Sequence, residues 1–387
     1  MRPVSPQTGT NAPRSRSRNR QAVLGQIHRA GTMGRAEIAR ELSLSTQAVS
    51  NIIADLEGDG MLLEKGRLAQ GRGQPAVQYA LNPEGGFALG FEVRPDAVFA
   101  AVLDMEGRSV ATRREALTAS DPETVLRCVR DLRDDVLGDA PKAGARLLGA
   151  GLVMPGPFGA TGIAGQGSEL TGWGEVDVVR HFSDALGLTV EVSNDANAAA
   201  MAERISGVAQ GLDHYAYLYF GAGLGLGIVS DGHLLHGAFG NAGEIGHVPL
   251  PSGASLESTL SRLSVQRHLA ARGTAAGDIE ALNRLYSGGN GDLSDWLAAA
   301  TEALSHALST IENMLDPQTV ILGGAMPAAL LDHLVDHTRP PALSIANRPD
   351  RTLPRLMRGT AGRMTATLGA AALVLNRTLT PQTLHAH

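Results

Sequence analysis

The chain has 387 residues, which suggests two or three domains, each large enough to bury its own core. A single cysteine excludes an intramolecular disulfide, and no signal peptide or uncharged apolar run of membrane-spanning length is evident, so we expect a cytoplasmic protein. The net charge of −6 hides a division, because residues 1–80 carry 11 Lys and Arg against 6 Asp and Glu, whereas residues 81–387 carry 22 against 33. The basic end is therefore the candidate for binding a polyanion.

The first residues are rich in Pro, Ser, Thr and Asn and contain no acidic side chain. Such a composition cannot build a core, so we expect residues 1–17 to form a disordered basic arm. The arm either contacts DNA phosphates or stays solvated. The arginines in and just after this stretch are Arg2, Arg14, Arg16, Arg18 and Arg20.

Three helical patterns and two short strands follow. The helices are expected from about Arg18 to Gly31, from Arg35 to Leu42 and from Thr46 to Glu57, and the strands at 61–64 and 76–81. A glycine-rich loop, residues 66–75, connects the strands. This order is typical of a winged helix-turn-helix domain, which we place at residues 18–82.

The third helix has one apolar and one polar face. A buried stripe is predicted for Val49, Ile52, Ile53 and Leu56. Short hydroxyl and amide side chains on the other face suit contacts with base edges, although an ordinary polar helix face is the alternative. Ser45 can also cap this helix, and the arginines of the loop suit a minor groove or phosphates. The residues expected to contact a double-stranded DNA operator are Ser45, Thr46, Gln47, Ser50, Asn51, Arg67, Arg72 and Gln74.

After Pro83, β-branched strands alternate with alanine-rich helices, which predicts α/β layers over residues 83–387. Strands are expected at 88–91, 98–104, 148–153, 190–193, 215–220, 226–229 and 319–322. Helices are expected at 122–137, 176–186, 196–206, 256–272, 293–315 and 362–376.

Several motifs in this region resemble the ROK family of repressors and sugar kinases. They are Gly151 to Pro157, Trp173, Asn194 to Ala200, Gly221 to Gly227, Ala242 to His247 and Gly369 to Leu373. The resemblance covers residues 18–376, because the loop sequence Gly71 to Pro75 also resembles the wing of the family's regulators. It implies an effector domain of two lobes with an actin-like ATPase or sugar-kinase fold, of the ribonuclease-H-like class, and a sugar cleft between the lobes.

By this resemblance, the effector contacts fall on Asn194, Asp195, Glu244, His247 and Glu257. Carboxylates, an amide and an imidazole suit the vicinal hydroxyls of a sugar, because they replace the hydrogen bonds that water supplies. For any one of these residues the alternative is a loop carboxylate or a helix cap. In the family's kinases, the residue that matches Asp195 deprotonates the attacked hydroxyl.

The phosphate loops depart from the family's kinases, which open this domain with Asp-x-Gly-Gly-Thr. Here the segment is Glu92-Val93-Arg94-Pro95-Asp96, in which Arg94 is bulky, Pro95 has no N–H and Asp96 adds negative charge. The second loop, Gly221 to Gly225, has Ala222 in place of threonine, and Gly323-Gly324 resembles the adenosine-side pair. We therefore expect neither ATP binding nor catalysis.

The zinc motif departs as well. Family members carry three cysteines after the Gly-His pair, but residues 248–256 contain none, so we expect no structural zinc and less support for His247. His233 and His236 have metal-ligand spacing, yet the edge of a β-hairpin is the favoured interpretation. Trp173 either lies at the pocket mouth or packs in the core.

The sequence thus predicts a sugar-responsive regulator, a repressor of carbohydrate genes that binds DNA as a homodimer or homotetramer, is nucleoid-associated and responds to a sugar or sugar phosphate. An ATP-dependent sugar kinase with an accessory DNA-binding domain is the alternative. A third possibility is a regulator with a vestigial pocket that senses a protein.

Overall fold

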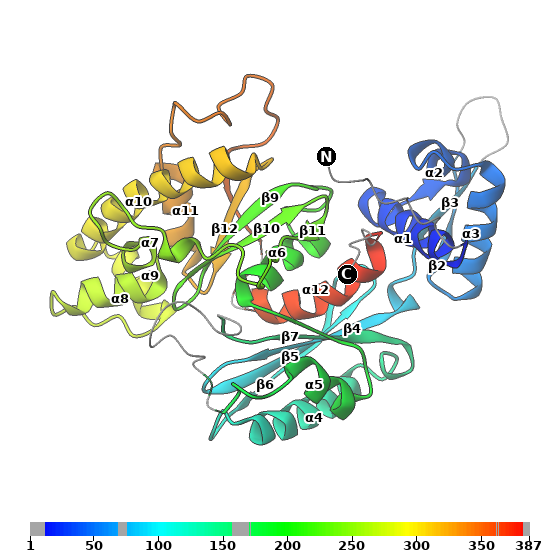
Figure 1. The fold of residues 1–387 in the computed structure, drawn as a ribbon, viewed down its shortest axis with the longest axis horizontal. Coiled ribbons are helices and arrows are strands. Elements are labelled where there is room, and N and C mark those ends of the chain that lie inside the picture. Colours follow the sequence, from blue (N-terminus) through cyan, green and yellow to red (C-terminus); the bar gives the residue numbers. More distant parts are fainter. Residues whose placement is uncertain are drawn as a thin grey trace, which may run out of the picture.

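The computed structural model describes residues 12–68, 76–156, 170, 172–360, 362 and 364–381. It has an N-terminal head and two lobes, one below and one above a pair of central helices in the view of Figure 1. No helix in the described part of the chain is long and apolar enough to cross a membrane.

The head contains three helices and a small sheet. Its elements are α1 (Ala12–Ala30), β1 (Met33–Gly34), α2 (Arg35–Glu41), α3 (Thr46–Gly58), β2 (Leu62–Leu68) and β3 (Ala76–Leu81). The sheet order is β1-β3-β2, and β2 and β3 form the antiparallel hairpin of a wing. The predicted winged helix-turn-helix order is therefore present, and α1 ends at Gly31, which has a φ of 75°.

The predicted arm is wrong for residues 12–17, since α1 begins at Ala12. The physical reason lies in α3, because Arg16 pairs with Asp55 and Arg20 pairs with Asp59. These ion pairs fix the first turns of α1 against the head. Residues 1–11 lie outside the described residues.

The two lobes repeat one sheet topology. In each, two antiparallel strands follow the first strand on one side and two parallel strands lie on its other side, which gives the orders β6-β5-β4-β7-β8 and β11-β10-β9-β12-β13. Lobe 1 contains η1 (Pro83–Gly85), β4 (Phe87–Val93), β5 (Ala97–Asp104), β6 (Ser109–Ala116), α4 (Pro122–Asp139), η2 (Gly144–Arg146), β7 (Leu147–Val153), α5 (Val178–Leu186) and β8 (Val190–Ser193).

Lobe 2 is covered on its outer face by helices. Its elements are β9 (Tyr215–Phe220), β10 (Leu224–Ser230), β11 (His233–Leu234), η3 (Ile245–His247), α7 (Leu256–Thr259), α8 (Arg262–Ala270), α9 (Ile279–Ser287), α10 (Gly291–Leu315), β12 (Val320–Gly324), α11 (Ala328–His337) and β13 (Leu356–Arg358). The single helix predicted at 256–272 is wrong, because Ser261 starts a new helix by accepting a hydrogen bond from the Ser264 N–H.

Two helices, α6 (Asp195–Ser206) and α12 (Thr365–Leu379), lie side by side between the sheets (Figure 1). Their contact uses residues without large side chains, since a Cβ added to Gly369 would overlap the carbonyl oxygen of Ala198. In the same way, a Cβ on Gly151 of β7 would overlap the carbonyl oxygen of Ala370. The alanine- and glycine-rich motifs of the sequence therefore form the closely packed middle layer.

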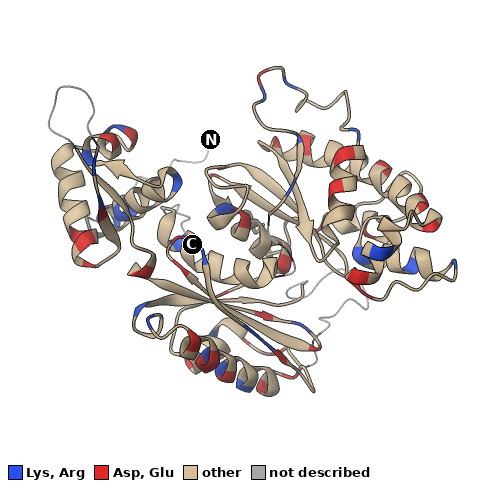
Figure 2. Ribbon diagram, turned by 180° about the vertical axis from the view of Figure 1, so that it is seen from behind, with Lys and Arg blue, Asp and Glu red and all other residues tan. Residues whose placement is uncertain are grey.

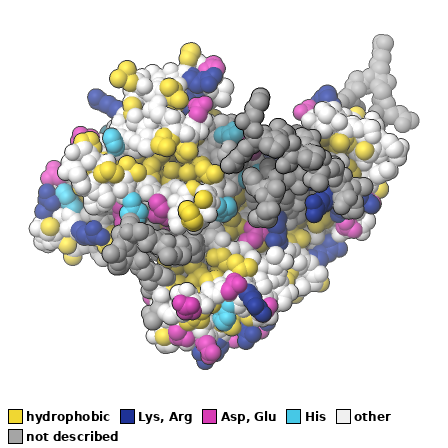
Figure 3. Space-filling view, in the orientation of Figure 1, with side chains coloured by type: hydrophobic (Ala, Val, Ile, Leu, Met, Phe, Trp, Pro, Cys, Tyr) yellow, Lys and Arg dark blue, Asp and Glu magenta, His cyan; other side chains and the backbone are white. Residues whose placement is uncertain are grey.

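Charged residues are few in this layer, and those of α6, namely Asp195, Glu203 and Arg204, lie toward its two ends. Along α12 the only charged residue is Arg377, whereas α4 on the outside of lobe 1 carries many acidic and basic side chains (Figure 2). Charges of both signs are interspersed over the outer surface of lobe 1, at the bottom of Figure 3. The apolar faces of the sheets and of the central helices form the cores of the protein.

We expect Gly369→Ala to lower the free energy of unfolding by ~1–3 kcal/mol, because the added methyl group forces α12 away from α6. Chemical denaturation followed by circular dichroism measures the change. The control is Gly138→Ala on α4, where an added Cβ meets nothing within 4 Å. That variant gains up to ~1 kcal/mol from helix propensity. Equal effects of the two substitutions would contradict the close contact.

Candidate functional site

The first predicted site residues lie at the start of α6. The side-chain oxygen of Asn194 accepts a hydrogen bond from the Asn197 N–H at 2.9 Å, so this amide caps the helix. Asp195 is the first helical residue, and its Oδ1 accepts from the Ala196 N–H at 2.8 Å. The capping role leaves the NH₂ group of Asn194 as the part that can bind a ligand.

The side chains of Asp195 and Glu257 both contact the glycine loop of residues 221–225. A Cβ on Gly221 would come within 3.2 Å of Oδ2 of Asp195, and a Cβ on Gly223 would overlap Oε2 of Glu257. The Leu224 N–H donates to the same Glu257 oxygen at 3.0 Å. The loop therefore brings two carboxylates from distant parts of the chain together, as a site for vicinal hydroxyls requires.

Glu244 directly precedes η3 and His247 is its last residue. This short helix lies next to Glu257. A Cβ on Gly246 would lie 3.2 Å from the Glu257 side chain. Nε2 of His247 is 3.7 Å from Oε2 of Glu244, and both side chains are about two-fifths exposed. These two residues are thus more open to solvent than Asp195, and they contact each other.

The segment that replaces the first phosphate loop is a turn between β4 and β5. Within it, Nε of Arg94 donates to Oε1 of buried Glu92 at 2.6 Å, and Oε2 of the same carboxylate accepts from the Thr367 hydroxyl at 2.6 Å. The guanidinium carbon of Arg94 lies 4.4 Å from the centre of the Phe99 ring. The arginine is therefore folded back on its own turn, where it neutralises Glu92.

These charges act on Asp195. Burial, together with the neighbouring carboxylate of Glu92, raises the pKa of Asp195 to about 6, although Arg94 acts in the opposite direction. A carboxyl group with this pKa changes its charge near neutral pH, unlike an exposed aspartate.

In the second glycine loop, two backbone N–H groups already have hydrogen-bond acceptors within the protein. The Gly221 N–H donates to the Gly223 carbonyl at 3.0 Å, and the Leu224 N–H is bound to Glu257, so these two donors are not free for a phosphate. The Gly323-Gly324 pair also has a packing role, because a Cβ on Gly323 would overlap the Tyr217 hydroxyl.

Sequence reasoning missed two buried polar side chains beside Asp195. Oγ of Ser193 and Oδ1 of Asn197 are buried and have no hydrogen-bond partner among the described residues. Buried polar atoms usually have partners, so these two are exceptions within the described structure. Asn197 belongs to the motif that was recognised, but its spacing alone resembles an ordinary helical position.

The other candidates have structural roles. Trp173 packs in the core of lobe 1, where it stacks on Phe182 at 6.0 Å and donates to the Ser120 carbonyl at 2.7 Å. His233 lies on β11 opposite Ser230, which confirms the predicted hairpin edge for this residue, whereas His236 lies beyond the end of β11. Among the described residues, no group of three or more His, Cys, Asp and Glu side chains could hold a metal ion.

Backbone hydrogen bonds close the segment after His247. Pro249 and Ser255 form a β-bridge, and the Leu256 N–H donates to the Val248 carbonyl at 2.9 Å. This small turn leads directly into α7, which carries Glu257.

The candidate DNA interface lies on α3 of the head. The structure confirms its buried stripe and its cap, in which Ser45 accepts from the Ala48 N–H at 3.2 Å. The predicted contact residues Ser45, Thr46, Gln47 and Asn51 are exposed, while Ser50 is half-buried. Nε2 of Gln47 donates to Oδ1 of Asn51 at 3.0 Å, which aligns the two amides on one face.

The wing bends before its tip. The pairing of β2 with β3 shifts register between Glu64 and Gly66, and Arg67 is exposed just beyond this irregularity. The predicted contacts Arg72 and Gln74 lie outside the described residues.

The model of the ROK family matches residues 89–377, well over half of the chain, so this chain belongs to the ROK family. A solved ROK family transcriptional regulator, a homologue of the Escherichia coli MLC protein, has a TM-score of 0.73 with 22% sequence identity, over 95% of this chain and 98% of the other. The fold is accordingly a winged helix-turn-helix head followed by two actin-like lobes of the sugar-kinase type.

The other similar proteins include repressors and kinases. The xylose repressor of Bacillus subtilis is 24% identical over 237 residues, and this match spans 60% of each protein. The ROK hexokinase from Thermus thermophilus has 26% identity and a TM-score of 0.58, over 74% of this chain and 97% of the enzyme.

Asp195 makes stability depend on pH. Because its pKa in the folded protein lies above that of an ordinary aspartate, the folded state binds this proton more tightly, and stability falls as the pH rises from about 4 to about 6. Asp195→Asn removes this loss, so the melting temperature of the variant rises relative to wild type through that interval and levels off above it.

Differential scanning fluorimetry from acidic to slightly alkaline pH measures this difference. The control is Asp350→Asn, because Arg348 lowers the pKa of that exposed carboxyl and the sign of its effect is opposite. A pH-independent difference between wild type and Asp195→Asn would show that Asp195 titrates normally.

Proposed function

We propose that the protein is a sugar-responsive DNA-binding transcriptional regulator, a repressor of genes for carbohydrate uptake or catabolism. The observation that carries this proposal is the combination, in one chain, of an exposed polar helix in the head and a cluster of two carboxylates, Asp195 and Glu257, near a turn in which Arg94 pairs with Glu92. The DNA-binding domain is residues 18–82, and the effector domain is residues 83–387.

On the DNA side, α3 enters the major groove with Thr46, Gln47, Ser50 and Asn51, while Ser45 and the wing residues Arg67, Arg72 and Gln74 contact phosphates or the minor groove. Amide side chains suit adenine, and arginines suit phosphate. A homodimer or homotetramer places two such helices about one DNA turn apart on a pseudo-palindromic operator.

On the effector side, the sugar contacts Asn194, Asp195, Glu244, His247 and Glu257. A sugar or a sugar phosphate that binds one arrangement of the lobes better than another shifts the protein toward it, and operator affinity changes accordingly. No zinc or nucleotide is needed for this response.

The relatives support this assignment. A protein named xylose repressor matches the chain, and the similar regulator structure covers the head as well as both lobes, whereas the ROK hexokinase covers 74% of the chain. The regulator therefore accounts for a part of the chain that the enzyme leaves unmatched.

An ATP-dependent sugar kinase with an accessory DNA-binding domain is the second candidate. The raised pKa and the position of Asp195 beside the glycine loop favour it, because a general base works best with a pKa near the working pH. The Arg94 side chain and the engaged N–H groups of the second loop oppose phosphate binding.

The test is binding of the purified protein to DNA from its own upstream region, measured by fluorescence anisotropy. D-glucose, D-xylose and N-acetyl-D-glucosamine are titrated with and without ATP. We expect one sugar to change operator affinity ~5- to ~150-fold without ATP. Asp195→Asn abolishes this response and keeps operator binding, because the side chain belongs to the effector site.

Asp184→Asn on α5 is the matched control, since that aspartate is about three-quarters exposed and pairs only with Arg180 among the contacts described for it. Loss of operator binding together with the sugar response in Asp195→Asn would count against the scheme. ADP release that requires Asp195, in a coupled assay, would establish the kinase instead.

A further inference from the structure

The head packs against the C-terminal ends of the two central helices, α6 and α12. At their N-terminal ends, α6 begins with Asp195 and α12 carries Thr367, which is bound to Glu92. Their C-terminal ends carry Arg204 and Leu379, which line the cavity at the base of the head. The candidate effector site and the head thus occupy opposite ends of one helix pair.

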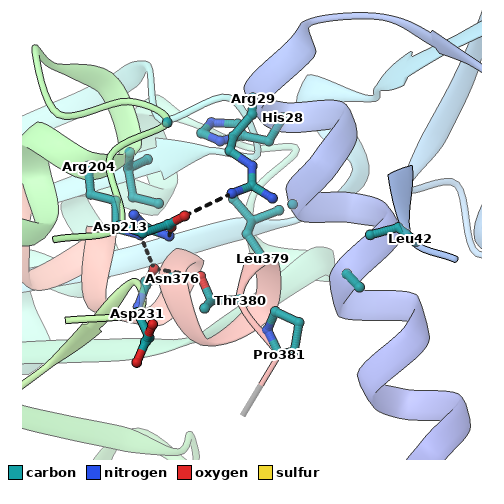
Figure 4. A pocket seen from close by; sticks show the side chains of 14 residues that line it. His28, Arg29, Leu42, Arg204, Asp213, Asp231, Asn376, Leu379, Thr380 and Pro381 are labelled. Atoms are coloured by element: carbon teal, nitrogen blue, oxygen red, sulfur yellow. Dashed lines mark hydrogen bonds and ion pairs between the residues drawn. The ribbon is translucent and has the colours of Figure 1, made fainter. Parts of the chain in front are cut away.

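Three contacts hold α1 of the head on this end. The amide of Gln21 donates to the Arg377 carbonyl at 3.0 Å, and Gly25 lies against the backbone of Leu379, because an added Cβ would overlap that carbonyl oxygen. Arg29 pairs with Asp213 at 3.6 Å (Figure 4). We call these contacts of Gln21, Gly25 and Arg29 the head contact.

Asp213 joins the head contact to α6. Its carboxylate also accepts from Arg204 at 3.2 Å, and Arg204 in turn bonds to the Leu212 carbonyl and to Asn376 of α12. The Arg204 side chain is only 10% exposed, whereas those of Arg29 and Asp213 are 40% and 45% exposed. A fixed arginine on the helix pair therefore positions the acid to which the head is attached.

The head contact is incompletely packed. A cavity of about 240 Å³ lies beside it, lined by side chains of the head such as His28 and Leu42 and by Asp231, Asn376 and Thr380 of the lobes (Figure 4). An exposed ion pair changes an equilibrium by no more than about fivefold. The ion pair is therefore a minor part of the docking of the head, because Val23, Leu24 and Ile27 of α1 belong to the same buried core as Leu375 and Leu379 of α12.

We propose that the head contact is a regulatory docking surface whose partner is the chain's own DNA-binding head, and that a sugar at the N-terminal ends of α6 and α12 changes the docking. This inference rests on the proposed function. Because the two helices are closely packed, they move as one body, and α6, with 12 residues at 1.5 Å each, is about 18 Å long. A shift of one end reaches the head at the other.

Gly25→Ala tests the proposal, because its methyl group pushes Leu379 away while alanine favours the helical state of α1. Arg29→Glu is the second variant, since it places a like charge beside Asp213. We expect both variants to bind the operator and to respond less to the sugar panel than wild type does. For Arg29→Glu, the fold-change in operator affinity falls by up to about fivefold, which is the limit for an exposed ion pair.

Hydrogen exchange checks the structure of the variants, and faster exchange at residues 21–29 is expected because the docked face is released. Gly138→Ala, remote from the head, keeps the wild-type response.

A full response in both variants overturns the inference and leaves the proposed function intact. Loss of operator binding by a variant with a folded head also overturns it, since docking would then be structural. Absence of any sugar response in wild type refutes the proposed function itself.

Discussion

The contact between α6 and α12 is the constraint on which the rest of the structure depends. Both sheets pack on this helix pair, and the helices approach so closely that Gly369 has no room for a methyl group. Asn194 and Asp195, at the N-terminal end of α6, belong to the candidate effector site, and the head packs against the C-terminal ends of both helices. The small residues of the middle layer therefore hold the two helices together as one unit, and the helix length sets the distance between the candidate site and the head.

Much of the fold could be predicted from periodicity, because the pattern of the head and of the buried strands is strong. The stripe from Val49 to Leu56 and the central strands β4, β7 and β9 were all expected at nearly their observed positions. The edge strand β6 was missed, since only Ala111 of its side chains is buried and the alternation is lost. The helices α9 and α11 were also missed, because both are short and short helices depend on tertiary packing, here on each other and on α10.

Only the site residues that belong to recognisable sequence motifs could be predicted. Asp195, Glu257 and the glycine loop come together as the resemblance implied, because each belongs to a distinct motif. The use of the Asn194 oxygen as a helix cap, and the pairing of Arg94 with Glu92, depend on local geometry and on Thr367, which lies 275 residues from Glu92. The sequence predicts that this turn departs from the phosphate loop of the family's kinases, but it does not reveal the contacts that Glu92 makes with Arg94 and Thr367.

The Arg94–Glu92 pair has a consequence for how such a regulator would work in a cell. A sugar kinase phosphorylates its substrate when ATP is present, so it consumes the sugar that it binds. A site in which Arg94 neutralises Glu92 and no nucleotide is needed would bind sugar as a reversible equilibrium. Its response would depend on the sugar concentration and not on the adenylate energy charge, and it would not consume the sugar. The switch would then return to its starting state as soon as the sugar is depleted.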